Sequence, residues 1–342
     1  MSRTSLSQAM MSAAVAMRRL LCSGRSEARG YNHCMHFLVT GGRSDVARAT
    51  VEGLVARGHR VSWLGPSLML PGRRGIIQIP RHDAPWRVTD FRGLDGILHL
   101  AGPHPNQHLS DADPREQARF VQTLFRRAAD AGVQRAVAIG VVSNPRVQDH
   151  PFVRTKQAME QAIRDSGIPA TIFRAPWLYG SNDDFLTRLW KWIRGRNVLL
   201  VPGLSQAPVQ LCSETLLADA IVQAIERPPG RLRIYEAATA SPISLGELIT
   251  QLGLIVRGKA PVIVPVSRHA FSVRGPLRVV GLIPLRSPMW TLLESGLTCA
   301  TVAFERDFGI RVQPARRALI EFVRSLDSGT RQSGRHISRA AG

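Results

Sequence analysis

Short apolar runs alternate with amphipathic stretches over the first half of the chain. Six such runs are predicted strands, and they lie at residues 36–40, 61–64, 75–79, 96–100, 136–139 and 170–173. Apolar residues recur at helical spacing between several of them, most clearly over residues 114–131. Strands that alternate with helices predict an α/β fold with a parallel sheet covered by helices on both faces.

The alternation becomes less regular after residue 180. Helices are predicted at 184–195 and 214–227, a short strand at 233–236, and a helix after Ser244, where Glu247 completes the spacing of a capping box. We therefore expect a Rossmann-type doubly wound sheet over residues 35–180. A smaller C-terminal α/β domain over 181–327 would be interleaved with it, and 328–342 would form a disordered tail.

An apolar, proline-rich segment interrupted by arginine covers residues 261–290. Two interpretations are open. It is either a surface segment or part of the core of the small domain, or it is a docking face for a partner protein or a membrane surface.

The formal net charge of +20 raises the possibility of a nucleic-acid partner. Part of this charge lies in the terminal segments, which contribute +4 over residues 1–34 and +3 over 328–342. Forty-two of the 45 basic residues are arginine, a bias typical of GC-rich genomes rather than of phosphate recognition. No basic run is interleaved with aromatic residues, so we expect no nucleic-acid binding.

Residues 1–34 are rich in Ser, Ala and Arg and contain a single acid, Glu27, a composition typical of a transit peptide. Alternatively Met35, directly before the first strand, is the true start. The arginine bias favours this second interpretation and a bacterial cytoplasmic protein, and the first would imply a mitochondrial one. The four cysteines show no metal-ligand spacing and suit a reducing compartment. No apolar run approaches the ~20 residues of a membrane span.

The turn between the first strand and the first helix predicts a dinucleotide site. Glycine at position 41 allows close backbone approach to a pyrophosphate, and the N-terminus of the helix supplies free N–H groups. Two expected glycines are absent, because Ser44 or Asp45 stands at one position and Ala47 at the other. On its own this turn is a weak signal.

Three further motifs follow in order: HLAGP at 99–103, FVRTK at 152–156 and RAPWLYGSNDDF at 174–185. Together with the turn they make residues 35–325 resemble an atypical or extended short-chain dehydrogenase. Within that superfamily the chain resembles the NAD(P)-binding epimerase/dehydratase and NmrA-like groups. It is also similar to relatives of the short-chain-dehydrogenase-like accessory subunit of respiratory complex I.

The resemblance implies a cofactor role for a set of matched positions. The pyrophosphate would be held by the turn and the start of the helix, at Thr40, Gly41, Gly42, Arg43, Ser44 and Val46. Ala101 and Gly102 would pass close to the adenine side of the cofactor. Lys156 would bind the nicotinamide ribose, and Pro176, Trp177 and Leu178 would flank the nicotinamide.

The chain departs from this family at the catalytic positions. Active members use a Tyr four residues before the Lys as a general acid, and a Ser at the end of the fifth strand. Here Phe152 occupies the Tyr position, and Gly140 and Val141 occupy the Ser positions. Ser143 would substitute only if its loop bends. Tyr179 or His150 could supply another acid, although a lone loop histidine is more often solvated.

We expect the cofactor to be NADP(H) rather than NAD(H). Residues 64–67 offer no acid for the ribose hydroxyls, whereas Arg43, Arg73 or Arg74 could face a 2′-phosphate. Three functions remain open. The first is a cofactor-binding protein without the usual acid–base pair, holding NADP(H) structurally, as a sensor or for non-standard chemistry. The second is an active oxidoreductase or nucleotide-sugar epimerase/dehydratase. The third is an accessory scaffold subunit of a respiratory or membrane-associated complex.

Overall fold

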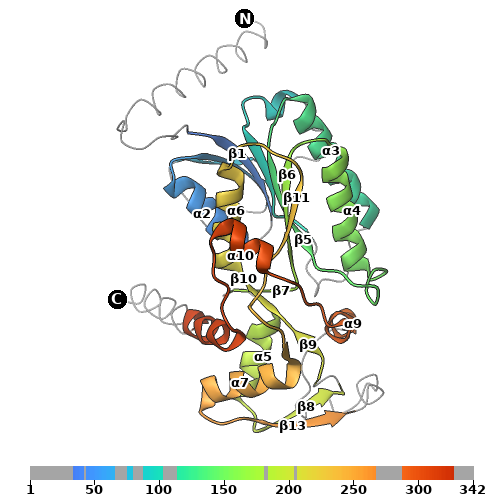
Figure 1. The fold of residues 1–342 in the computed structure, drawn as a ribbon, viewed down its shortest axis with the longest axis vertical. Coiled ribbons are helices and arrows are strands. Elements are labelled where there is room, and N and C mark those ends of the chain that lie inside the picture. The colour runs from blue at the N-terminus through green and yellow to red at the C-terminus, as the bar shows by residue number, and fades with distance from the viewer. Residues whose placement is uncertain are drawn as a thin grey trace, which may run out of the picture.

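A seven-stranded parallel sheet forms the centre of the molecule, shown as a computed structural model in Figure 1. The structure describes residues 34–41, 44–65, 75–79, 88–102, 114–180, 184–203, 206–266 and 287–326. The strand order is β11-β6-β5-β4-β1-β2-β3. The strands are β1 (His36–Thr40), β2 (Arg60–Leu64), β3 (Ile76–Ile79), β4 (Gly96–His99), β5 (Ala136–Val141), β6 (Ala170–Ala175) and β11 (Arg233–Glu236). The order reverses between β1 and β4, as in doubly wound dinucleotide-binding folds.

Two pairs of helices cover the two faces of this sheet. The helices α2 (Asp45–Ala56) and α6 (Glu214–Glu226) lie on one face, and α3 (Pro114–Asp130) and α4 (Pro151–Asp165) lie on the other (Figure 1). Side chains of β5 alternate accordingly: Val137 and Ile139 join the core under α2 and α6, whereas Ala136 and Ala138 join the core under α3 and α4. The predicted parallel sheet with two covered faces is confirmed.

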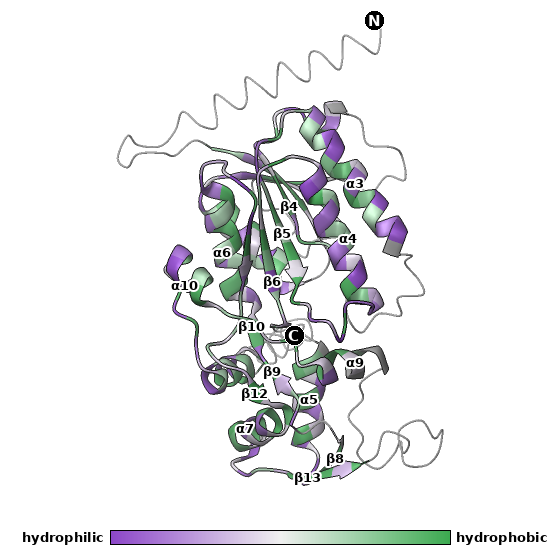
Figure 2. Cartoon of the chain, turned by 45° about the vertical axis from the view of Figure 1, so that its right-hand side comes forward, coloured by the Kyte–Doolittle hydropathy of each residue, from purple (hydrophilic) through white to green (hydrophobic). Residues whose placement is uncertain are grey.

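A smaller assembly lies beyond the carboxyl ends of the central strands (Figure 2). Among the described residues it contains three two-stranded sheets: β7 (Trp177–Tyr179) with β10 (Leu211–Ser213), β9 (Pro208–Val209) with β12 (Ile243–Ser244), and β8 (Val198–Pro202) with β13 (Val262–Val266). Its helices are α5 (Asp184–Arg194), α7 (Leu245–Arg257), α9 (Ser287–Ser295) and a last helix over residues 315–326. The short helix α10 (Val302–Phe308) packs back against β11, and a 3-10 turn covers Val88–Phe91.

The predicted helices at 184–195 and 214–227 are confirmed to within one residue as α5 and α6. The predicted cap of α7 is also present, since the Ser244 side chain accepts the Glu247 N–H at 3.1 Å. Although they follow residue 180, α6 and β11 belong to the main sheet and its cover. The segment 261–290 contributes β13 and the start of α9, and its residues 267–286 lie outside the described part. The leader 1–33 and the tail 327–342 lie outside it too.

Candidate functional site

The carboxyl end of β1 is tied to β4 by a buried hydrogen bond between side chains. Thr40 Oγ1 lies 2.7 Å from His99 Nδ1, and Thr40 and His99 are register partners. Burial, followed by the charge of Lys156, lowers the pKa of His99 to about 3, so the ring is neutral at ordinary pH. This hydrogen bond fixes the strand end from which Gly41 leaves.

The N-terminus of α2 begins directly after the glycine turn. Ser44 is its N-cap and accepts the Ala47 N–H at 3.3 Å. Asp45 is buried and lies 3.3 Å from an Arg48 guanidinium nitrogen. A Cβ at Gly180 would lie 2.9 Å from Asp45 Oδ2 and 2.5 Å from Glu214 Oε2. Two acids from the first turns of α2 and α6 therefore converge on the backbone at Gly180.

Gly65, at the end of β2, packs directly against the glycine turn. A Cβ at this position would lie 2.2 Å from the Gly41 carbonyl oxygen, a backbone atom that cannot move away cheaply. The preceding residue, Leu64, is buried in the core under α3 and α4. Neither position could therefore present an acid toward a bound ribose.

Lys156 projects from α4 to the carboxyl ends of β4 and β5. Its amine donates to the Ile139 carbonyl at 3.2 Å and to the Ala101 carbonyl at 3.4 Å. The amine also occupies the space that a Cβ at Gly102 would need, since that Cβ would lie 2.3 Å away. Burial lowers the pKa of Lys156 to about 8, and the nearby Glu160 carboxylate opposes this shift. The Ala101–Gly102 turn thus lies directly on the lysine.

The two positions that would hold the catalytic Tyr and Ser are apolar and buried. Phe152 and Val141 belong to one hydrophobic cluster, which also contains Trp177 and the core of the smaller assembly. Phe152 is 7% exposed and Val141 is 3% exposed. Both positions therefore belong to an apolar core and offer no acid–base pair.

Gly140 points away from this cluster, toward α4. A Cβ there would lie 2.1 Å from Glu160 Oε1, and that carboxylate forms a bidentate ion pair with Arg174 whose shortest distance is 2.6 Å. A serine at residue 140 would collide with this pair.

The three residues that could replace the missing hydroxyl and acid, Ser143, His150 and Tyr179, are poorly suited to that role. Ser143 Oγ accepts a hydrogen bond from Gln157 Nε2 at 3.2 Å, on the exposed side of α4. His150 is buried and caps α4, accepting the Phe152 N–H at 3.2 Å, so the expectation of a solvated histidine is wrong. Burial raises the pKa of Tyr179, which makes its phenol a weaker acid.

The motif that begins at Arg174 continues from β6 into β7. Pro176 separates the two strands, and β7 pairs in parallel with β10 so that Trp177 faces Leu211 and Leu178 faces Cys212 in register. The Trp177 ring lies 5.4 Å from the Phe185 ring, centroid to centroid. The backbone of Trp177 is thus fixed by pairing with β10, and its ring is fixed by packing in the core of the smaller assembly.

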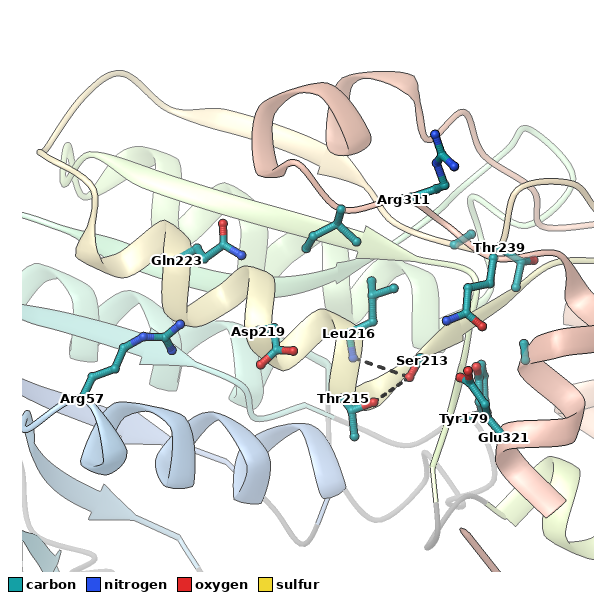
Figure 3. Close-up of a pocket in the computed structure, with 14 residues that line it drawn as sticks. Arg57, Tyr179, Ser213, Thr215, Leu216, Asp219, Gln223, Thr239, Arg311 and Glu321 are labelled. Carbon is teal, nitrogen blue, oxygen red and sulfur yellow. Dashed lines mark hydrogen bonds between the residues drawn. The ribbon is translucent and has the colours of Figure 1, made fainter. Parts of the chain in front are cut away.

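A polar groove of about 510 Å³ runs along the outer side of α6 (Figure 3). Arg57 lies at one end and Arg311 at the other, with Asp219 and Gln223 between them and Tyr179 beside Ser213 (Figure 3). No described residue that the sequence predicts for cofactor binding lines this groove. Gly42, Arg43, Arg73 and Arg74 lie outside the described residues.

Comparisons with solved structures give the fold a name. A Citrobacter triphenylmethane reductase complexed with NADP(H) matches 84% of this chain over 100% of its own, at a TM-score of 0.63 and 17% identity. MoeE5 in complex with UDP-glucuronic acid and NAD matches 84% of this chain over 99% of its own, at a TM-score of 0.63 and 19% identity. The Thermotoga maritima UDP-glucose 4-epimerase with UDP-glucose matches 86% of this chain over 100% of its own, at a TM-score of 0.59 and 16% identity.

The chain shares the fold of these structures, as its resemblance to extended short-chain dehydrogenases predicts. No family model matches it, and no curated protein matches it in sequence. The predicted resemblance to the epimerase/dehydratase and NmrA-like groups is confirmed at the level of fold. The likeness to the accessory subunit of complex I stays a prediction.

Within this fold, the described residues offer donors that suit a nucleotide. The first turn of α2 presents backbone N–H groups beside Gly41, and Lys156 presents a buried amine at the ends of β4 and β5. Sequence reasoning missed His99, Glu160 and Arg174, although a histidine in an apolar run and the Lys156–Glu160 helical spacing were visible signals. The described part contains no cluster of three metal-ligating side chains.

Proposed function

We propose that this protein binds a nicotinamide dinucleotide, NADP(H) in preference to NAD(H), and holds it without the usual acid–base pair. One observation carries the proposal. The elements that would bind a dinucleotide are kept at the carboxyl ends of β1, β4 and β5, while the acid and hydroxyl positions are apolar and packed. The cofactor would serve as a structural element or as a sensor of the nicotinamide pool.

The residues that match the family's motifs would bind different parts of the cofactor. Thr40, Gly41 and the first turn of α2, at Ser44 and Val46, would receive the pyrophosphate. Lys156 would move from its carbonyl partners to the nicotinamide ribose, and Pro176, Trp177 and Leu178 would flank the ring. Two of the solved structures described above hold such a ligand, NAD in MoeE5 and NADP(H) in the triphenylmethane reductase, which supports this class of ligand.

The preference for NADP(H) follows from the end of β2. NAD-selective sites place an acid there, and here Leu64 is buried and Gly65 has no room for a side chain. A 2′-phosphate would then meet a region whose sequence supplies arginine, at Arg43, Arg73 and Arg74.

A bound nicotinamide dinucleotide supplies hydride transfer, and the remaining requirement would be a proton donor at the substrate. Phe152 has no transferable proton, and the Gly140 position is closed by the Glu160–Arg174 pair. Losing an acid–base group costs about 10²–10⁴ in rate. Carbonyl reduction through this set of residues would therefore be slow.

Fluorescence or calorimetric titration of NADPH and NADH into the purified protein tests the proposal. We expect saturable binding of both, tighter for NADPH, and loss of affinity by at least about tenfold in Lys156→Met, since a charge-assisted hydrogen bond is removed. Lys191→Met is the matched control, because Lys191 is an exposed lysine on α5. Absence of binding at millimolar NADPH and NADH would exclude the proposal.

A further inference from the structure

One end of the molecule, farthest from the main sheet, is formed by β8 and β13 (Figure 1). The inner face of this two-stranded sheet is buried, with Leu199 and Val201 fully covered by the cluster that contains α5 and α7. The outer face is apolar but exposed: Val198 is 48%, Val262 59% and Val264 36% exposed.

These exposed side chains lie together. The register pairs Val198 with Val262 and Leu200 with Val264, and residues two apart share a face of a strand. We call these four residues the valine face. A cluster of exposed β-branched side chains on a sheet is unusual, because such residues are normally packed against a second layer.

The surroundings of the valine face are cationic. Exposed Arg194, Arg196 and Lys259 lie in the segments that lead into the two strands. Arg257 joins those segments by donating to the Ile193 carbonyl at 3.3 Å and also to the carbonyl of Arg196. The sequence contains no Asp or Glu between Asp184 and Glu214, or between Glu247 and Glu294. Both strands therefore come from stretches without a single acid.

The edges of the same sheet are poorly suited to pairing with another strand. Pro202 lies in β8 and Pro265 in β13, and each removes a backbone N–H that an added strand would need. A partner would therefore cover the face. A face that combines apolar side chains with neighbouring cations matches the boundary between lipid headgroups and acyl chains in an anionic membrane.

We propose that the valine face docks on an anionic lipid surface, with the valines entering the interface and the neighbouring cations contacting the headgroups. The contact would be peripheral, since no helix in the described part is long and apolar enough to cross a membrane. A polyanion such as RNA would contact the cations but leave the valines in water. RNA bases would also need aromatic side chains on which to stack, and the tryptophans of the neighbouring helix α5, Trp190 and Trp192, are buried.

Co-sedimentation of the full-length protein with vesicles tests this proposal. We expect binding to vesicles of phosphatidylcholine mixed with phosphatidylglycerol, little binding to phosphatidylcholine alone, and weakening by added salt. Each juxtamembrane cation is worth about fivefold in affinity, so Arg196→Glu should reduce binding by at least about that factor. Val262→Asp should reduce it similarly by placing a carboxylate at the interface. Both positions are exposed, so both variants should fold.

Two matched variants control for general effects of charge. Val302→Asp changes a valine that is 73% exposed on α10, and Arg119→Glu changes an exposed arginine on α3; both should bind vesicles as the unmodified protein does. Equal binding to neutral vesicles, no vesicle binding at all, or full binding by the Val262→Asp/Arg196→Glu double variant would overturn the proposal. Retention of polyuridylate without retention of vesicles would overturn it in favour of a nucleic-acid surface.

Discussion

Lys156 is buried among backbone carbonyls, and this environment gives it a structural role and a lowered pKa in the protein without ligand. Its amine bridges Ala101 on the turn after β4 and Ile139 on β5, so it holds the two strand ends together. Burial favours the neutral amine and lowers its pKa to about 8, which means that the charged form is less stable in the folded protein than in the unfolded chain.

The sign of the resulting pH dependence follows from proton binding. Between pH 8 and 10.5 the unfolded chain keeps the Lys156 proton and the folded protein has lost it, so the free energy of unfolding rises with pH in this window. The rise from this group is on the order of 3 kcal/mol. Lys156→Met should abolish it, so the stability difference between variant and unmodified protein should shift by that amount in urea unfolding from pH 7.5 to 10.5.

Lys191→Met again serves as the control for replacing a lysine, because Lys191 is exposed on α5. A pH-independent difference for Lys156→Met would contradict the buried, depressed lysine. Lys156→Met should also change the free energy of unfolding by an amount that is present at every pH, because the Ala101 and Ile139 carbonyls lose a donor.

The sequence predicted Lys156 as a site residue, because the motif FVRTK places it at a fixed distance from Phe152. It did not predict the partners of the lysine or the Thr40–His99 hydrogen bond, which joins residues 59 positions apart. Such pairs depend on strand register, and register arises from the packing of the whole sheet rather than from local pattern.

At the scale of elements, β5, α4 and β6 are joined by the ion pair between Glu160 and Arg174. Glu160 is 4% exposed and accepts three hydrogen bonds from the Arg174 guanidinium. The pair fits only because residue 140, on the intervening strand, has no side chain. The glycine at residue 140, where the family resemblance predicts a serine, thus has a structural reason of its own.

Gly140→Ala should displace the Glu160 carboxylate and break this ion pair. Breaking a buried pair costs about 3–5 kcal/mol, and we expect a loss at the lower end of that range because Arg174 is partly exposed. Urea unfolding measures the loss. Gly195→Ala is the control, since a Cβ there meets nothing within 4 Å, and it should change stability by less than about 0.5 kcal/mol. Equal effects of the two substitutions would contradict the steric argument.

Most of the long elements were predictable, because their periodicity extends over several turns or a full strand. The two-residue strands β9 and β12 were not, since two residues carry no periodic signal. Nor could the pattern show that β7 pairs with β10 or β8 with β13. Residues of these strands belong to one hydrophobic cluster with residues far away in the sequence, among them Phe185 and Leu252, so the pairings depend on tertiary packing.

At the scale of the whole molecule, the chain returns to its first sheet after leaving it. The strand β11 pairs with β6, and α6 packs against α2. Tyr235 on β11 then donates to Asp307 Oδ2 at 2.8 Å, which brings α10 onto the same edge. The sequence predicted both α6 and β11 as elements, and it predicted interleaving, but not that they complete the sheet and its helical layer.

Residues 35–180 should therefore fail to fold alone, although they contain six of the seven strands. Removing α6 opens the core that α6 shares with α2 and the main sheet, to which it contributes Leu217, Ile221, Val222 and Ile225, each at most 1% exposed. Burial of four such side chains contributes about 6–12 kcal/mol, which is comparable to the whole stability of a domain. Circular dichroism and thermal unfolding should show no cooperative transition for 35–180 and a cooperative one for 35–326. A cooperative transition in the shorter fragment would instead make the dinucleotide-binding half an autonomous domain.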